Sequence, residues 1–411
     1  MLYDWANSAF ATTVLAGFFP VFFKTWWAGS MPAARSTALL GTAASASVVL
    51  VVAAALLLGA LSDVTGTRKR LLLAFCVLGA SATAAMALVP RGGALIALVL
   101  YVVGTVGYAG GNVFYDALLP LVAPPGRLDS VSARGFALGY AGGGVLLAAQ
   151  VGIVAFPRAV GLPDEAAAVR LSFVATGLWW VLFAIPLALL VREPRPARSV
   201  SPLAEIRASL GRLASTLRSI LSYRDLLVFL LAFWCYMDGV GTIVRMATAY
   251  GADLGLGTRH LMGALLMVQF IGLPATWIHG LLAARMGRRP VILAGIAAYA
   301  AVVVLAYTMS SPLHFFVLAG VVGLFQGGIQ AISRSLYASM APPGRSAEFF
   351  GFYTMSERFS AFLGPLVVGW TAGLSSSPRL GILALVPLFV IGASLLLIVD
   401  PRRGGARAAM D

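Results

Sequence analysis

The chain has 411 residues, of which 60% are hydrophobic and 11% are charged, and its formal net charge is +14. Soluble domains carry about 25% charged residues, so this composition excludes an ordinary water-soluble protein and indicates a membrane protein. The basic residues lie in short loops between apolar runs, where they orient a chain in the membrane, so the net charge does not indicate nucleic-acid binding.

Twelve apolar runs are long enough to cross a bilayer, which takes about 20 residues per helix. The first begins almost at Met1 and is too long for the apolar part of a cleavable signal peptide, so we expect it to remain as a span. The predicted fold is an all-α membrane protein with twelve transmembrane helices. The spans are predicted near 5–27, 38–61, 71–90, 94–119, 134–157, 170–191, 225–250, 261–282, 291–309, 313–340, 348–373 and 379–399.

Two motifs recur at nearly the same offset. Residues 59–70 return as residues 280–289, which is 221 residues later, and Ala-Pro-Pro-Gly-Arg at 123–127 returns 218 residues later at 341–345. Agreement of the two offsets to within three residues indicates that a whole half of the chain is duplicated. Parallel repeats in a hydrophobic chain are typical of membrane transporters, so the twelve spans are predicted to form two six-helix pseudo-repeats.

The predicted domains follow from this repeat. Residues 1–191 are expected to form an N-terminal six-helix bundle and residues 225–399 a C-terminal one. Between them, residues 192–224 form a cytoplasmic linker, in which apolar residues at spacings of three and four after Ser201 predict an amphipathic helix on the membrane surface. Residues 400–411 are a predicted cytoplasmic tail.

The loop after the second span resembles the signature loop of the major facilitator superfamily, Gly-x-x-x-Asp-x-x-Gly-x-basic-basic. The resemblance implies a conformational latch, in which the aspartate caps or pairs with a neighbouring helix end. The second copy has Ala284 where the first has Asp63, so the aspartate latch is expected only in the N-terminal half. The latch residues are Gly59, Asp63, Gly66, Arg68 and Lys69 in the first copy and Gly280, Gly287 and Arg288 in the second.

The distribution of basic residues predicts the orientation. With both termini in the cytoplasm, the cytoplasmic segments hold 19 of the 29 basic residues, and the external segments hold seven, Lys24 among them. An excess of arginine and lysine marks the cytoplasmic side, so both termini are expected there.

Six ionisable residues fall inside predicted spans, and Asp4 lies at the mouth of the first. Each such group costs at least about 2.5–3.5 kcal/mol at bilayer depth unless it is paired or hydrated, which favours a functional role. A buried ion pair that only fixes helix packing is the alternative. The six residues are Asp116, Asp238, Arg245, Arg334, Glu357 and Arg358.

These charges suggest how a substrate is held. The 218-residue offset sets Asp116 opposite Arg334, so the two are expected to meet across a central cavity. Asp238 and Arg245 are seven residues apart, on one face of a helix, and could flank one zwitterionic substrate. Arg245 or Arg334 is expected to hold a carboxylate. Asp238 or Asp116 would receive the amino group or a coupling proton.

Polar residues near these charges extend the predicted site, although each of them could instead bond a neighbouring helix. The resemblance implies that the first, fourth, seventh and tenth spans line the cavity. The predicted substrate-binding residues are Asn7, Asn112, Tyr115, Asp116, Tyr236, Asp238, Arg245, Gln326, Gln330 and Arg334. The predicted coupling or ion-pair residues are Asp4, Asp116, Asp238, Glu357 and Arg358.

Two further stretches resemble a particular branch of the superfamily. Leu2–Phe10, with the following Gly17–Lys24, and Gly111–Pro120 are similar to the vacuole-effluxer-like branch, the relatives of the autophagy-related permease of fungal vacuoles. The resemblance implies export of small solutes, with neutral amino acids as the fungal precedent. For a chain of this size it implies a bacterial plasma membrane.

The predicted function is secondary active transport of a small solute by alternating access. No phosphate-binding Gly-x-x-x-x-Gly-Lys-Ser/Thr loop occurs, so the expected energy source is an ion gradient, protons among the candidates, or the gradient of the substrate. Drug or sugar efflux by the same fold, or a non-transporting membrane receptor, are the alternatives. Three histidines and two cysteines make no catalytic or metal-binding set, so neither an enzyme nor a cofactor is expected. The expected partners are a small-molecule substrate and the lipid bilayer, without nucleic acid, and the protein is expected to be a monomer.

Overall fold

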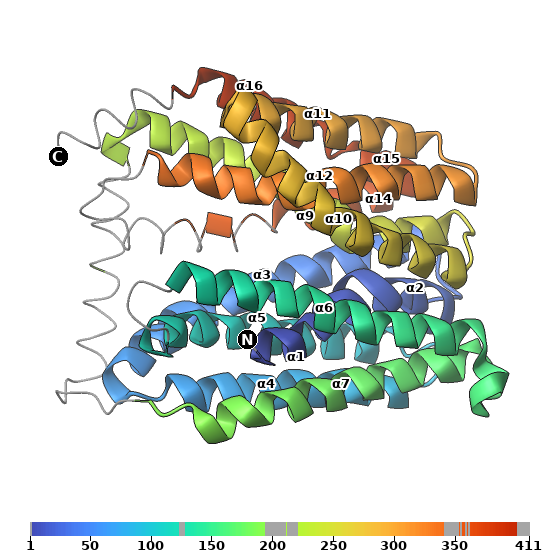
Figure 1. Ribbon diagram of the computed structural model, residues 1–411. Coiled ribbons are helices and arrows are strands. Elements are labelled where there is room, and N and C mark those ends of the chain that lie inside the picture. Colours follow the sequence, from blue (N-terminus) through green and yellow to red (C-terminus); the bar gives the residue numbers. More distant parts are fainter. Residues whose placement is uncertain are drawn as a thin grey trace.

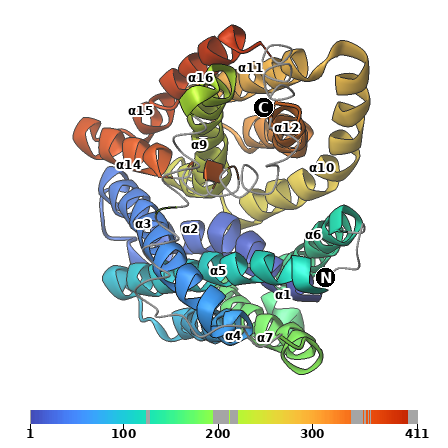
Figure 2. The ribbon, with the colours of Figure 1, turned by 90° about the vertical axis from the view of Figure 1, so that its left-hand side faces the viewer.

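The computed structural model describes residues 2–122, 128–193, 221–340 and 362–400, together with Gly211, Tyr353, Ser356, Glu357 and Ser360. In this part of the chain every regular element is a helix. Figure 1 shows two stacked groups of helices, and Figure 2 shows the same two groups from one end. The first group holds α1 to α7 and the second holds α9 to α16.

The first group starts with a span made of four short segments, two of them π-helical. These are α1 (Leu2–Phe10), the π-helical η1 (Ala11–Gly17), α2 (Phe18–Phe22) and the π-helical η2 (Phe23–Trp27). The group continues with α3 (Ala33–Thr65), α4 (Arg68–Ala85), the short η3 (Met86–Leu88), α5 (Ala94–Val122), α6 (Leu128–Ala155), the short η4 (Pro157–Val160) and α7 (Glu165–Leu190).

The second group consists of long helices followed by three shorter ones. Its members are α9 (Arg224–Asp253), α10 (Thr258–Met286), α11 (Arg288–Tyr307), α12 (Pro312–Ala338), α14 (Leu363–Ser375), α15 (Pro378–Leu383) and α16 (Val386–Ile398). Among the described residues, α3 packs against α14, and α6 packs against α10, where the two groups meet.

Ten helical stretches of the described residues are long and apolar enough to cross a membrane, and the bent pair within α10 makes an eleventh if it is one span. The predicted span at 348–373 coincides in part with α14, and most of the rest of it lies outside the described residues. The count of twelve therefore stays a prediction with which the described helices are compatible. The predicted linker helix after Ser201 lies almost entirely outside the described residues, as does the tail after Asp400.

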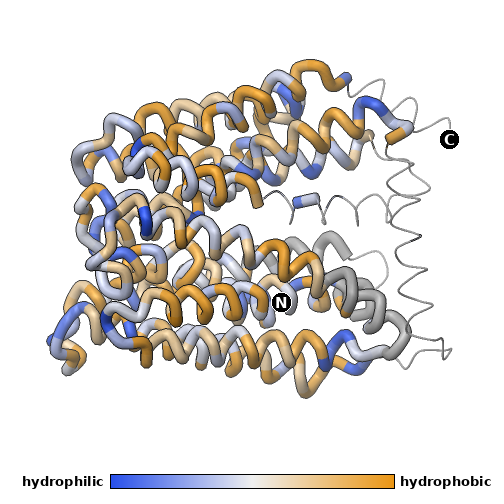
Figure 3. Tube along the Cα trace, turned by 180° about the vertical axis from the view of Figure 1, so that it is seen from behind, coloured by the Kyte–Doolittle hydropathy of each residue, from blue (hydrophilic) through white to orange (hydrophobic). Residues whose placement is uncertain are grey.

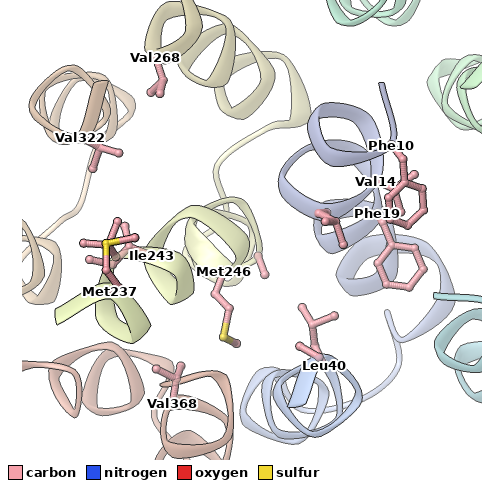
Figure 4. Packing of buried hydrophobic residues seen from close by; sticks show 14 of the residues in the cluster. Phe10, Val14, Phe19, Leu40, Met237, Ile243, Met246, Val268, Val322 and Val368 are labelled. Carbon is pink, nitrogen blue, oxygen red and sulfur yellow. The ribbon is translucent and has the colours of Figure 1, made fainter. Parts of the chain in front are cut away.

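Apolar side chains cover the outside of the molecule as well as its core. Figure 3 shows hydrophobic residues along most of the length of the described helices. Leu95 and Phe270 are each 75% exposed and Leu374 is 89% exposed. Lipid is the environment in which such a surface is stable. Inside, buried hydrophobic side chains of both groups form one continuous cluster, part of which is seen in Figure 4.

In both groups the repeated motif ends a helix at a glycine with positive φ. Gly66 ends α3 with φ of 59°, and its N–H donates to the Ser62 carbonyl at 3.0 Å. Gly287 separates α10 from α11 with φ of 89°. Glycine adopts positive φ at no steric cost, so these two positions allow the helix to stop and reverse. We call the end of the molecule that carries these turns the basic end, and the other end the opposite end.

Candidate functional site

Four predicted site residues meet in the first group. Asn7 of α1 donates from Nδ2 to Oδ1 of Asn112 on α5 at 2.5 Å, and the Tyr115 hydroxyl donates to the Asp4 carboxylate. The close approach of α6 needs a glycine, because a Cβ on Gly135 would lie 2.5 Å from Oδ2 of Asp4. The first and fourth spans therefore share a polar cluster, and its binding of a substrate stays a prediction.

Two predicted charges lie toward the basic end. Asp116, near the end of α5, and Arg334, near the end of α12, are both exposed. Arg334 and the exposed Glu357 both act electrostatically on Tyr353, so these two charges share a neighbourhood. Arg358 lies outside the described residues. The pairing of Asp116 with Arg334 stays a prediction.

Asp238 is buried in α9 and holds the start of α14. The residue is 3% exposed, and its Oδ2 accepts the N–H of Gly364 at 2.8 Å. A carboxylate is stabilised at a helix N-terminus, where N–H groups lack partners and the helix dipole is positive. The second oxygen, Oδ1, is buried and has no hydrogen-bond partner among the described residues. Asp238 thus caps the start of α14 through Oδ2, while Oδ1 is a buried acceptor.

Arg245 lies two turns further along α9 and is half-buried. Its charge acts on Asp238 of the same helix and on Tyr101 of α5, so it lies where the two groups face each other. Tyr236, another predicted site residue, is buried and shares a hydrogen bond of 2.7 Å with Ser333 of α12.

The two predicted glutamines lie on α12 and are half-buried. Gln326 is on the wall of a cavity of about 80 Å3 inside the second group. The other walls are almost entirely apolar, with Thr248 and Tyr250 of α9 as the further polar contributors. Gln330 lies one turn closer to the basic end.

The structure adds a charged cluster that the sequence did not indicate. Lys24 of η2 forms an ion pair with Asp253 at the end of α9, with 2.6 Å between Nζ and Oδ2 and side-chain exposures of 4% and 3%. Thr37 of α3 donates to the same Oδ2 at 2.8 Å and also bonds the Lys24 ammonium. We call Lys24, Thr37 and Asp253 the clasp. Lys24 was counted among the external basic residues, and Asp253 fell just beyond the predicted span at 225–250.

A glycine seam joins α3 to α14 beside the clasp. A Cβ on Gly41 would lie 2.2 Å from the carbonyl oxygen of Pro365, and one on Gly369 would lie 3.1 Å from Cα of Ala38. Small residues of this kind allow helices to approach closely in membranes. The Ser45 hydroxyl adds a hydrogen bond to the Phe362 carbonyl at 2.8 Å.

A further contact joins the first span to α9. The Thr248 hydroxyl donates to the Ala16 carbonyl in η1 at 2.8 Å. The clasp, the Ser45 bond and this contact are the hydrogen bonds found between the two groups where side chains are described. All of them lie in the part of the helices nearer the opposite end.

At the basic end, each repeated turn is tied to the end of the sixth span of its own group. The Glu193 carboxylate accepts the N–H groups of Arg68 and Lys69, both at 3.0 Å, and Lys69 Nζ donates to the Val191 carbonyl at 2.7 Å. In the second group, Arg289 donates to the Val399 carbonyl at 3.2 Å and to that of Leu397.

The remaining latch residues are placed only in part. Arg288 is exposed, and Gly280 lies on α10 with open space beside it. Gly59 and Asp63 belong to α3, but the side chain of Asp63 lies outside what the structure describes. Its role as a latch stays a prediction.

The fold and the polar interior together define a class of protein. The chain matches a bacterial homologue of the human lysosomal transporter Spinster, in its inward-facing and unoccupied conformation, with a TM-score of 0.69, 16% identity and coverage of 99% of this chain and 96% of that one. It matches a D-xylose–proton symporter with a TM-score of 0.69, 13% identity and coverage of 98% and 97%. At sequence identities this low, a structural match shows only that the two chains share a fold. The fold is that of the major facilitator transporters, and the predicted all-α membrane fold is confirmed.

Sequence comparison then narrows the class. Residues 27–409 match the model of the vacuole effluxer Atg22-like family, and the chain belongs to this family. The chain is 40% identical over 401 residues to the uncharacterized MFS-type transporter YxiO of Bacillus subtilis strain 168, covering 97% of this chain and 93% of that protein. It is 23% identical over 405 residues to autophagy-related protein 22 of Saccharomyces cerevisiae strain S288c, covering 84% and 75%. The predicted family is confirmed, and the protein is a multi-pass membrane transporter rather than an enzyme.

Proposed function

We propose that this protein exports a neutral amino acid, or a similar small zwitterionic metabolite, by alternating access. The observation that carries the proposal is that, where the structure describes side chains, the polar contacts between the two groups lie toward one end. The clasp and the glycine seam join the two groups toward the opposite end, whereas Asp116 and Arg334 toward the basic end are exposed. Such one-sided closure is what a transporter needs when its two halves rock about a central site.

The proposed orientation makes the basic end cytoplasmic, in a cell membrane. It is supported by the 19 basic residues assigned to that side against seven on the other. In this orientation the structure corresponds to an inward-facing state. The predicted bundles, residues 1–191 and 225–399, are the two bodies that move. Export is the direction that the effluxer family suggests.

A zwitterionic substrate is supported by the groups around α9. Oδ1 of Asp238 can accept from an ammonium group, and the Arg245 guanidinium can hold a carboxylate in a two-pronged geometry. The Asn7–Asn112 pair offers neutral donors and acceptors on the facing group. Asp116 or Asp238 would carry the coupling proton if transport responds to a pH gradient.

Efflux of an apolar, drug-like solute is the second candidate. The almost entirely apolar cavity beside Gln326 favours it, because such a wall offers few polar groups to a zwitterion. A non-transporting receptor, the remaining alternative, would bind a ligand without flux.

The test is counterflow of labelled leucine into proteoliposomes, with and without a pH gradient. We expect uptake by the unmodified protein and a loss of about tenfold or more in Arg245→Ala, because a charge-assisted bond to the carboxylate is removed. Arg35→Ala is the matched control, because Arg35 is exposed at the opposite end. Uptake of an apolar solute without leucine uptake would favour the second candidate, and binding without any flux would favour the receptor.

A further inference from the structure

The clasp is the single ion pair between the two groups among the described residues. We propose that it is the gate of the external end, which breaks when that end opens and forms again when it closes. The proposal rests on the alternating-access function proposed above. It assigns Lys24, Thr37 and Asp253 as gating residues, and it places the control of opening outside the predicted substrate site.

Burial separates this pair from an ordinary surface salt bridge. Exposed pairs contribute little because water screens the charges. The two side chains of the clasp are 4% and 3% exposed, so removal of either partner leaves a buried charge without compensation. The closed state of this end is therefore sensitive to each member of the pair.

The bonds of the clasp are distributed unequally between the two groups. All three donors of the Lys24 ammonium are used, on Asp253, on Thr37 and on the Ala33 carbonyl at 3.0 Å. Thr37 and Ala33 belong to the same group as Lys24. When the groups separate, Lys24 can keep two of its three bonds, whereas Oδ2 of Asp253 loses both of its donors. Opening therefore requires water to reach the Asp253 carboxylate.

The backbone around the clasp supports a moving contact. Lys24 lies in the π-helical η2, and the Thr248 bond on α9 reaches Ala16 in the π-helical η1. Single π-helical turns are rare and occur often at functional sites. Both π-helical segments of the first span thus contact α9, one through the clasp and one through Thr248.

The experiment measures access to the closed end without using a substrate. In a background of Cys76→Ala and Cys235→Ala, the reporter is Leu40→Cys. Leu40 is 3% exposed on α3, one turn beyond Thr37, and Figure 4 shows it near Met246 of α9. A membrane-impermeant maleimide is added to intact cells, and the rate of labelling is followed.

We expect Lys24→Met and Asp253→Asn each to raise the labelling rate by about tenfold or more, because each leaves an unpaired buried charge in the closed state. Arg35→Gln removes the same charge from an exposed neighbouring position and is expected to label as slowly as the unmodified protein. The exchanged pair, Lys24→Asp with Asp253→Lys, is expected to return labelling toward the slow rate.

Thr37→Val keeps both charges and the shape of the side chain, and so it tests the clasp if the charge variants fail to fold. Loss of the Thr37 hydrogen bonds to Asp253 and to the Lys24 ammonium is expected to raise labelling by about threefold to tenfold. Folded single variants that label at the unmodified rate would overturn the gate. Labelling needs no substrate. Fast labelling of the variants, together with no leucine counterflow by the unmodified protein, would refute the proposed substrate and leave the gate standing.

Discussion

The buried Asp238 combines two tasks in one carboxylate. Its Oδ2 holds the N–H of Gly364 at the start of α14, while Oδ1 has no partner among the described residues. Gly364 permits this contact, because a Cβ there would lie 2.0 Å from Oγ1 of Thr242. A residue that fixes packing and also offers an acceptor to a ligand should respond differently to isosteric and to truncating substitutions.

We expect Asp238→Asn to stay folded, because its amide oxygen can still accept from Gly364, and to lose leucine counterflow by about tenfold or more, because the charge that binds an ammonium is gone. Asp238→Ala should in addition lower stability by about 0.5–2 kcal/mol, the usual cost of losing a helix cap. Counterflow and thermal unfolding of the purified protein separate the two effects. Full counterflow in Asp238→Asn would remove Asp238 from the site.

At the scale of elements, the seam between α3 and α14 depends on close backbone approach. Gly41 leaves no room for a side chain, since the nearest backbone atom would be 2.2 Å from its Cβ, and that atom belongs to the other group. The two helices therefore cannot keep their present separation if this position carries a methyl group.

Gly41→Ala should therefore weaken closure of the opposite end and raise labelling of the Leu40→Cys reporter by about threefold or more, because overpacking at a tight contact is destabilising. The matched control is Gly152→Ala on α6, where a Cβ meets open space. Equal labelling of the two variants would show that the seam can adjust without opening.

The elements also show what a sequence can predict. The spans and the two tight turns were predictable, because the length of an apolar run and a glycine followed by basic residues are local signals. Contacts between remote residues carry no such signal. Lys24 and Asp253 are 229 residues apart, and Asp238 and Gly364 are 126 apart, so neither the ion pair nor the cap could be inferred from spacing.

On the scale of the whole molecule, the two groups should move as bodies between two states. Because the described contacts between the groups lie toward the opposite end, we expect the basic ends of the two groups to approach each other when the opposite end opens.

Spin labels on Arg70→Cys of α4 and Arg288→Cys of α11, both exposed at the basic end, report this separation in the background of Cys76→Ala and Cys235→Ala. We expect the distance distribution to shift to shorter values in Lys24→Met, because the variant destabilises closure of the opposite end. Pulsed electron paramagnetic resonance measures the distribution of distances between the two spin labels. An unchanged distribution in a folded variant would contradict a coupled movement of the two ends.

The ties at the basic end have a mechanical consequence. Lys69 fastens the first group's turn to Val191, and Arg289 fastens the second group's turn to Val399. In each half the turn and the end of the sixth span are therefore held together. We expect these two segments to move as one piece when the halves rock, so that the force of the movement is carried within each half.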